Sequence, residues 1–131
     1  MKYFEFELKD GKLYKLRLTA ENACQLEEKT KTKLLDYISD YSVNTIINLL
    51  MYCMRAEDPT SNKTKASKLF DDLADNGYAL EDMIDKIIYP TLVISGFLKH
   101  AKLQEQQQME EKMATIKEKV DNQIDQVIQR L

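Results

Sequence analysis

The stretch that decides how this chain folds lies at residues 4–18 and reads FEFELKDGKLYKLRL. Apolar and charged side chains alternate over residues 3–8 and again over residues 13–18. An alternation with a period of two predicts two short β-strands, each with one apolar face. Because an isolated hairpin is only marginally stable in water, we expect helices from the rest of the chain to cover that face.

The turn between the strands contains Asp-Gly, which commonly forms a two-residue hairpin loop. Such a loop would place Phe6 opposite Lys15 and would divide the apolar residues between two faces. A three-residue loop over 9–11, with Gly11 in the left-handed bulge position, keeps the apolar face together. We therefore predict the odd loop, which pairs Phe6 with Tyr14 and Phe4 with Leu16.

Three helical segments are predicted to follow the hairpin. Thr19 suits the N-cap of a helix that fades near residues 30–32, and residues 34–38 form another turn or two. Ser42 caps the clearest amphipathic helix of the chain, predicted over 43–57. Its apolar stripe consists of Val43, Ile46, Ile47, Leu50, Met51 and Met54.

Two further helices are predicted between the loop at 60–64 and residue 99. The first resumes near Lys65 and ends at Asn76-Gly77, which is typical of a left-handed C-cap. The second begins near Leu80. Pro90 lacks an N–H donor, so we expect it to kink or break this helix.

The remaining residues, 100–131, form a different compositional segment, rich in Gln, Glu, Lys and Met. Their apolar positions approximate a heptad seam with one slip, which predicts a long amphipathic helix. We therefore divide the chain into a globular domain over 1–99 and a helical tail over 100–131. The apolar stripe of the tail either binds a partner or a second copy, or packs back on the body. We favour the first, with contacts at Met109, Met113, Ile116, Val120 and Val127.

The predicted elements place the chain in the α+β class, mostly α: an N-terminal β-hairpin packed on a small helical bundle, with a long C-terminal amphipathic helix. The 131 residues carry a net charge of −3, which argues against a nucleic-acid partner because phosphate contacts need an excess of cations. The N-terminus lacks the apolar run of a signal peptide, and no uncharged run reaches the length of a membrane span. We expect a cytoplasmic protein.

The sequence contains few of the residues and motifs that form catalytic or metal-binding sites. His100 is the one histidine, and no Cys-x-x-Cys motif or glycine-rich phosphate loop occurs. Cys24 and Cys53 fall on helical stripes that we interpret as apolar, so we expect two buried, reduced thiols. We predict no enzymatic activity, no metal and no cofactor.

An acidic stretch at residues 71–85 holds six carboxylates and no base before Lys86. Its spacing does not match an EF-hand loop. The plain interpretation is the solvated faces of two helices, and the alternative is a patch for a basic partner. The acidic residues are Asp71, Asp72, Asp75, Glu81, Asp82 and Asp85.

Several short segments of the sequence resemble segments of the tail assembly chaperones of long-tailed phages and prophages of Gram-positive bacteria. They are KYFEF at 2–6, KLYKLRLT at 12–19, ACQLEEK at 23–29, GYALEDMI at 77–84 and SGFL at 95–98. The chain departs from the family pattern at Pro90 and in lacking a glycine after residues 31–33. The tail lies outside the resemblance.

The resemblance implies a non-enzymatic protein of the host cytoplasm that binds the tape-measure protein before the tail tube polymerises, with the tube protein as a possible further partner. Two other functions remain open. One is a coiled-coil adaptor that forms a homodimer or another homo-oligomer through its tail. The other is a small acidic phage inhibitor that binds a basic host protein through residues 71–85.

Overall fold

The N-terminal hairpin has the register that the apolar faces predict. The computed structural model describes residues 1–99, in which β1 (Phe4–Glu7) and β2 (Leu13–Leu16) pair antiparallel. Phe4 lies opposite Leu16 and Phe6 opposite Tyr14, with the two rings of the latter pair stacked at 5.3 Å between centroids. Gly11 has a φ of 82°, and its N–H donates to the Leu8 carbonyl at 2.9 Å. The three-residue loop is therefore confirmed.

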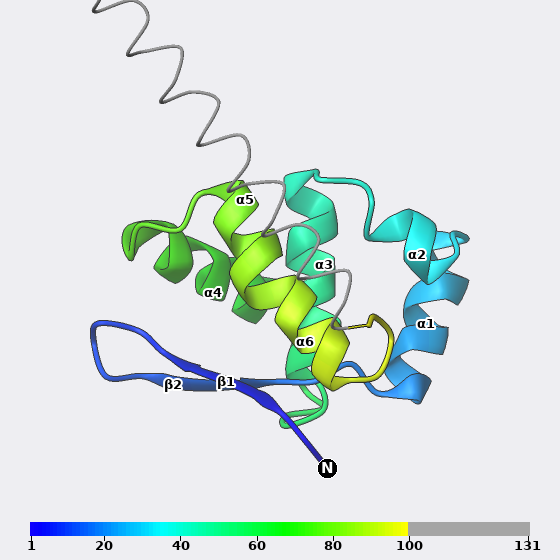
Figure 1. Cartoon of the computed structure of the whole chain (residues 1–131), viewed down its shortest axis with the longest axis horizontal. Coiled ribbons are helices and arrows are strands. Elements are labelled where there is room, and N and C mark those ends of the chain that lie inside the picture. Colours follow the sequence, from blue (N-terminus) through cyan, green and yellow to red (C-terminus); the bar gives the residue numbers. More distant parts are fainter. Residues whose placement is uncertain (100–131) are drawn as a thin grey trace, which may run out of the picture. The chain divides into compact units, whose positions relative to one another are not determined.

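Helices cover the apolar face of this hairpin, as Figure 1 shows. Leu8, Leu16 and Leu18 are buried at 5%, 1% and 1% exposure. The Arg17 N–H donates to the Cys53 carbonyl at 3.1 Å and ties the end of β2 to the helix that contains Cys53. The α+β, mostly α fold with a hairpin packed on helices is thus observed for the described residues, and Met1–Leu98 form one compact unit.

The first helices begin where capping residues were predicted. α1 (Ala20–Thr30) starts after Thr19, whose side chain accepts a hydrogen bond from the Asn22 N–H. It ends where Lys31 takes a left-handed conformation with φ 52°. The short α2 (Leu34–Tyr37) follows directly.

α3 (Val43–Met54) is the central helix and packs against α1, α4, β2 and η1. Ser42 caps it by accepting from the Thr45 N–H, as predicted. Residues 45–54 are buried except Asn48, so this helix is buried nearly all round and not only along the predicted stripe. The helix ends three residues before the predicted Glu57. Val43 was predicted to belong to the apolar stripe, but it is 44% exposed, and the buried part of the helix begins at Thr45.

α4 (Lys63–Asp75) begins two residues earlier than predicted, since the Asn62 side chain accepts from the Lys65 N–H and acts as its cap. At its end the Tyr78 N–H donates to the Leu73 carbonyl at 3.0 Å, and Gly77 has φ 89°. This is the glycine C-cap that the sequence predicts.

Of the two outcomes expected at Pro90, a kink or a break, the break does not occur, because the last helical segment continues through the proline. The chain runs from α5 (Leu80–Met83) through a π-helical turn, η1 (Ile84–Ile88), into α6 (Tyr89–Ile94). The Tyr89 N–H donates to the Ile84 carbonyl, five residues back. A wider turn just before the proline accommodates the missing donor without stopping the helix.

The two cysteines have different environments. Cys53 is buried in α3, as predicted, but Cys24 is exposed. The prediction of two buried thiols is therefore wrong for Cys24. Ala23 and Leu26 form the buried face of α1, and Cys24 lies about 100° around the helix axis from Ala23. Within residues 1–99, no helix combines the length and apolarity that a membrane span needs.

Candidate functional site

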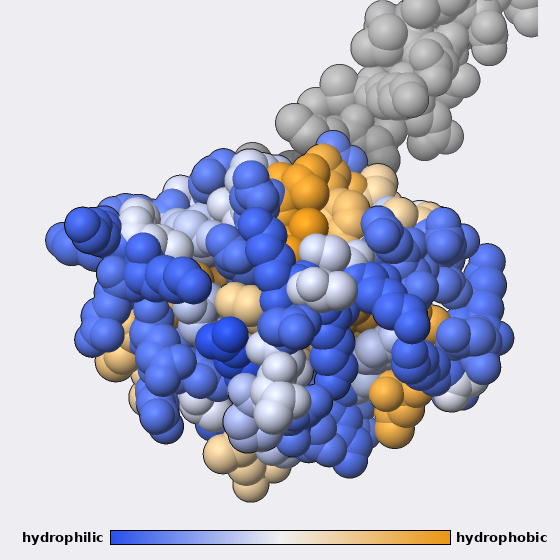
Figure 2. All heavy atoms as spheres, turned by 180° about the vertical axis from the view of Figure 1, so that it is seen from behind, coloured by the Kyte–Doolittle hydropathy of each residue, from blue (hydrophilic) through white to orange (hydrophobic). Residues whose placement is uncertain are grey.

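Exposed apolar side chains gather at the end of the described unit where α3 and α5 begin. Tyr41 is 54% exposed, Val43 44% and Leu80 39%. Seen from behind, hydrophobic side chains form a patch at this upper end (Figure 2). Exposed apolar surface that is contiguous marks partner sites more often than scattered single residues do.

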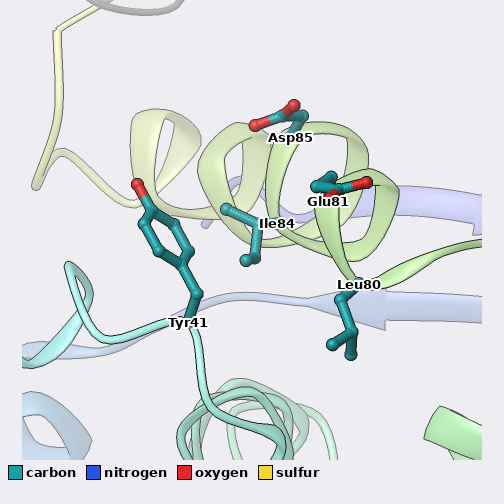
Figure 3. Close-up of a pocket in the computed structure, with 5 residues that line it drawn as sticks. All are labelled: Tyr41, Leu80, Glu81, Ile84 and Asp85. Atoms are coloured by element: carbon teal, nitrogen blue, oxygen red, sulfur yellow. The ribbon is translucent and has the colours of Figure 1, made fainter.

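A hollow of about 320 Å³ opens within this cluster, between the loop before α3 and the start of α5. Figure 3 shows the Tyr41 ring rising from that loop toward Ile84, with Leu80 at the start of the helix. Ile84 is 6% exposed and therefore belongs to the wall of the hollow and to the core at once. Glu81 and Asp85 complete the lining.

Hydrogen bonds around the α3 N-terminus hold Tyr41 in place. The Asp40 carboxylate accepts from the Ser42 N–H at 3.2 Å and from the Thr45 hydroxyl at 3.1 Å. Tyr41 is thereby fixed between two residues that belong to the cap. Tyr41 directly precedes the N-cap Ser42, and an apolar side chain at this position often packs against the fourth residue of the helix. Tyr41 nevertheless keeps 54% of its surface in solvent.

The opposite wall is a single helical surface. Leu80 and Ile84 are four residues apart, as are Glu81 and Asp85, so two adjacent rows run along α5 and into η1, one apolar and one acidic. The start of this surface is anchored by Asp82, which accepts from the Ala79 N–H at 2.9 Å. This hydrogen bond lowers the pKa of the Asp82 carboxyl, and Lys86 at 3.4 Å adds to the effect.

Among residues 1–99, the charged residues that line the hollow are Glu81 and Asp85. Lys86, the next base along the helix, lies against Asp82. The described lining thus combines an aromatic ring and two aliphatic side chains with two acidic residues.

A second hollow of about 580 Å³ lies between α1, α2 and Phe97. Cys24 and Leu35 contribute to it, and Leu35 is 60% exposed. Its rim carries Glu27, Lys33 and Asp36, so both signs of charge are present. A mixed rim specifies no charge on a partner.

The partner-binding residues predicted from the sequence lie outside the described residues. They are Met109, Met113, Ile116, Val120 and Val127. Met51 and Met54, which were predicted to belong to the apolar stripe of the central helix, are confirmed as buried at 6% exposure each.

The acidic residues of the stretch at 71–85 have different roles in the structure. Asp72 accepts from the Tyr14 hydroxyl at 3.3 Å, and Asp82 caps the turn before α5. Glu81 and Asp85 line the hollow. In the part of the chain that the structure describes, no group of three or more His, Cys, Asp or Glu side chains is placed to hold a metal ion.

Sequence reasoning missed the role of Tyr41 and Leu80. Tyr41 begins the longest uncharged run of the chain, and a large aromatic residue directly before an N-cap is the signal that could have drawn attention to it. Leu80 was recognised only as the start of a helix. Their proximity depends on how η1, which continues α5, packs against α3, and no local sequence pattern predicts this packing.

In comparisons with known proteins, no protein-family model, no curated protein and no solved structure matches the chain.

Proposed function

We propose that this chain is a non-enzymatic tail assembly chaperone that binds a phage tape-measure protein in the cytoplasm of the host cell and so assists assembly of the tail tube. The proposal rests on the family resemblance of residues 2–98 together with the surface described above. A tape-measure chain is long, helical and apolar in places, and it aggregates unless those segments are covered. A small helical body with open apolar surface is suited to cover them through helix-in-groove contacts.

The observation that carries the proposal is the exposed apolar cluster around the hollow beside α5. Tyr41 and Leu80 line this hollow beside the buried Ile84, and each keeps more than a third of its surface in solvent. Burying apolar surface stabilises an association by about 25 cal/mol per Å² before its entropic costs. This cluster therefore favours a binding function over a purely structural one.

Residues 100–131 are proposed as a second contact with the same partner, through Met109, Met113, Ile116, Val120 and Val127. Methionine side chains adapt to varied apolar surfaces, which suits a partner with several similar segments. If the tail instead joins two copies of this chain, the protein is a homodimerising adaptor.

Co-expression with the tape-measure protein encoded by the same genome tests the proposal. We expect the tape-measure protein to aggregate alone and to become soluble when the full chain is present. An unrelated acidic protein of similar size is the control. An unchanged soluble fraction would overturn the proposal.

The double substitution Met113→Asp and Ile116→Asp tests the contribution of the tail in the same co-expression assay. Under the proposal it lowers the soluble fraction of the tape-measure protein. Light scattering of the full chain separates the adaptor function, since a dimer that becomes a monomer in the double variant assigns the tail to self-association.

A further inference from the structure

We propose that Asn76 is a site of spontaneous deamidation, and that the contact between the hairpin turn and the end of α4 protects it while the protein is folded. The reaction needs only water and leaves an aspartyl or isoaspartyl residue where the helix meets the hairpin. The proposal is independent of the function proposed above, because it concerns the chemistry of this one contact.

The Asn-Gly pair at 76–77 supplies the chemical reason. Asparagine is a thermolabile residue, because the backbone nitrogen of the next residue can attack the carbon of its side-chain amide. A glycine in that next position leaves the approach open, since it has no side chain. Asn76 is the one asparagine of the chain that precedes a glycine, whereas the others precede Ala, Thr, Leu, Lys or Gln.

The reaction balances without an oxidant or a reductant. The Gly77 nitrogen forms a bond to Cγ of Asn76 and gives up its proton. The bond between Cγ and the amide nitrogen breaks, and that nitrogen leaves with the proton as ammonia. Water then opens the cyclic imide at either of its two carbonyls. One opening gives aspartate, and the other gives isoaspartate, in which the main chain runs through Cγ.

The native backbone keeps the two reacting atoms apart. Asn76 has a ψ of 12°, so the Gly77 nitrogen nearly eclipses the Asn76 nitrogen. It therefore lies about a third of a turn away from Cβ around the Cα–C bond, whereas ring closure needs it on the side of Cβ. The Gly77 N–H also donates to the Ala74 carbonyl at 3.1 Å. The helix end must open before the ring can form.

The side-chain amide of Asn76 is held at both ends by backbone groups. Its oxygen, Oδ1, accepts from the Lys9 N–H in the hairpin turn at 3.0 Å. Its nitrogen, Nδ2, donates to the Asp72 carbonyl, one turn back in α4, at 2.7 Å. Moving this amide toward Gly77 requires the hairpin turn and α4 to separate. Such local openings cost less free energy than global unfolding.

Deamidation loosens the same contact. A carboxylate at position 76 has no N–H to donate to the Asp72 carbonyl, so two acceptors face each other there. It also places a negative charge at the C-terminal end of α4, where the helix dipole disfavours one. The isoaspartyl product further lengthens the main chain directly before Gly77, whose φ of 89° belongs to the C-cap. The modification therefore favours the open state in which it arises.

Peptide mapping by mass spectrometry of the full chain tests the proposal. Trypsin cleavage after Lys68 and Lys86 releases residues 69–86, in which Asn76 is the one asparagine and glutamine is absent. Conversion of this peptide to the acid is followed at mildly alkaline pH, with and without denaturing urea. We expect the conversion to be at least about tenfold faster in urea, because the hydrogen bonds that hold the amide and the helix end are lost. Asn62, in residues 56–63, is the internal control and reacts slowly in both, since Lys63 follows it.

Lys9→Pro isolates the contribution of the hairpin turn. Proline has no N–H, so it removes the donor to Oδ1 of Asn76. The Gly11 N–H donates to the Leu8 carbonyl, which makes Lys9 the first central residue of the turn, and proline is favoured there in a type I turn. Lys9→Ala is the matched control because it keeps the N–H. We expect Lys9→Pro to deamidate several-fold faster than Lys9→Ala under native conditions.

The consequence of the modification is tested with two aspartate variants at opposite ends of α4. Asn62 is the N-cap, where aspartate caps as well and its charge is favourable, so Asn62→Asp should unfold at a urea concentration no lower than the wild type. Asn76→Asp, which has the side chain of one product, should unfold at a lower concentration. Equal midpoints for the two variants would show that the modification does not loosen the contact.

The proposal is overturned if Asn76 deamidates as fast without urea as with it, or if it stays intact in both. Equal rates for Lys9→Pro and Lys9→Ala, with both folded by circular dichroism, would show that the hairpin turn does not protect the site. If Lys9→Pro does not fold, Gly11→Ala takes its place, because it strains the turn at a φ of 82°. The same acceleration is then expected, and its absence has the same meaning.

Discussion

Replacing Ser95 with alanine should destabilise the protein more than its surface position suggests. Ser95 is the C-cap of α6, and its hydroxyl accepts a hydrogen bond from the Leu18 N–H at 2.9 Å. The same hydroxyl donates to the Thr91 carbonyl at 2.7 Å. One side chain thus joins the end of the last helix to the segment that leaves the hairpin.

The magnitude follows from what the substitution leaves behind. Leu18 is 1% exposed, so its backbone N–H loses the Ser95 acceptor in a place that water does not reach. An unsatisfied buried donor costs about 1–3 kcal/mol. With a urea m-value of about 2 kcal/mol per molar, a loss of about 2 kcal/mol shifts the unfolding midpoint by about 1 M. The corresponding fall in Tm is on the order of 10 °C.

Urea unfolding followed by far-UV circular dichroism measures this change. Ser39→Ala is the matched control, because the Ser39 hydroxyl also donates to a backbone carbonyl, that of Asp36 at 2.6 Å, but at an exposed site. We expect the control to stay within about 0.5 kcal/mol of the wild type. If Ser95→Ala unfolds at the same urea concentration as Ser39→Ala with an unchanged m-value, the hydroxyl does not hold α6 to the hairpin.

Three further predictions concern ionisable groups. Burial raises the pKa of the Cys53 thiol to about 12, so the unfolded chain releases this proton first, near its ordinary pKa of 9.0. Stability should therefore be complete below that pH and decline above it by up to about 1.4 kcal/mol per pH unit, a slope that Cys53→Ala removes in urea titrations. Ellman's reagent should titrate Cys24 alone in the native protein and both thiols in urea; rapid reaction of both in the native state would contradict the burial of Cys53. The Lys65 ammonium and the Thr60 hydroxyl and N–H, all donating to Asp58, lower the pKa of that carboxyl from 3.8 to about 2. Lys65→Met should raise the Asp58 midpoint in a carboxyl NMR titration, and an unmoved midpoint would show that the ion pair does not form in solution.

Local patterns in the sequence were sufficient for the elements of the described fold. The register of the hairpin follows from its apolar alternation, because a slip of one residue would turn every apolar side chain to the other face. Thr19 and Ser42 mark helix starts through hydrogen bonds that reach only three residues along the chain. Gly77 marks a helix end because its φ of 89° is one that other residues rarely adopt.

A local sequence pattern did not predict how the helix responds to Pro90 or which residues of α1 are buried. Pro90 removes a donor, but a helix can respond by breaking, by kinking or by widening one turn, and here η1 provides the wider turn. Cys24 is chemically suited to a buried stripe, yet the narrow face of α1 that meets the core is filled by Ala23 and Leu26.

By itself, the sequence determined the hairpin, its register, the order of the helices and the presence of an acidic stretch, because each of these depends on neighbours a few residues apart. The tertiary structure alone decided that Tyr41 meets Leu80 and Ile84, about forty residues later, and that Glu81 and Asp85 form the rim of the resulting hollow. The reason is that the hollow lies between the loop before α3 and the α5–η1 segment, which are brought together only by the tertiary fold.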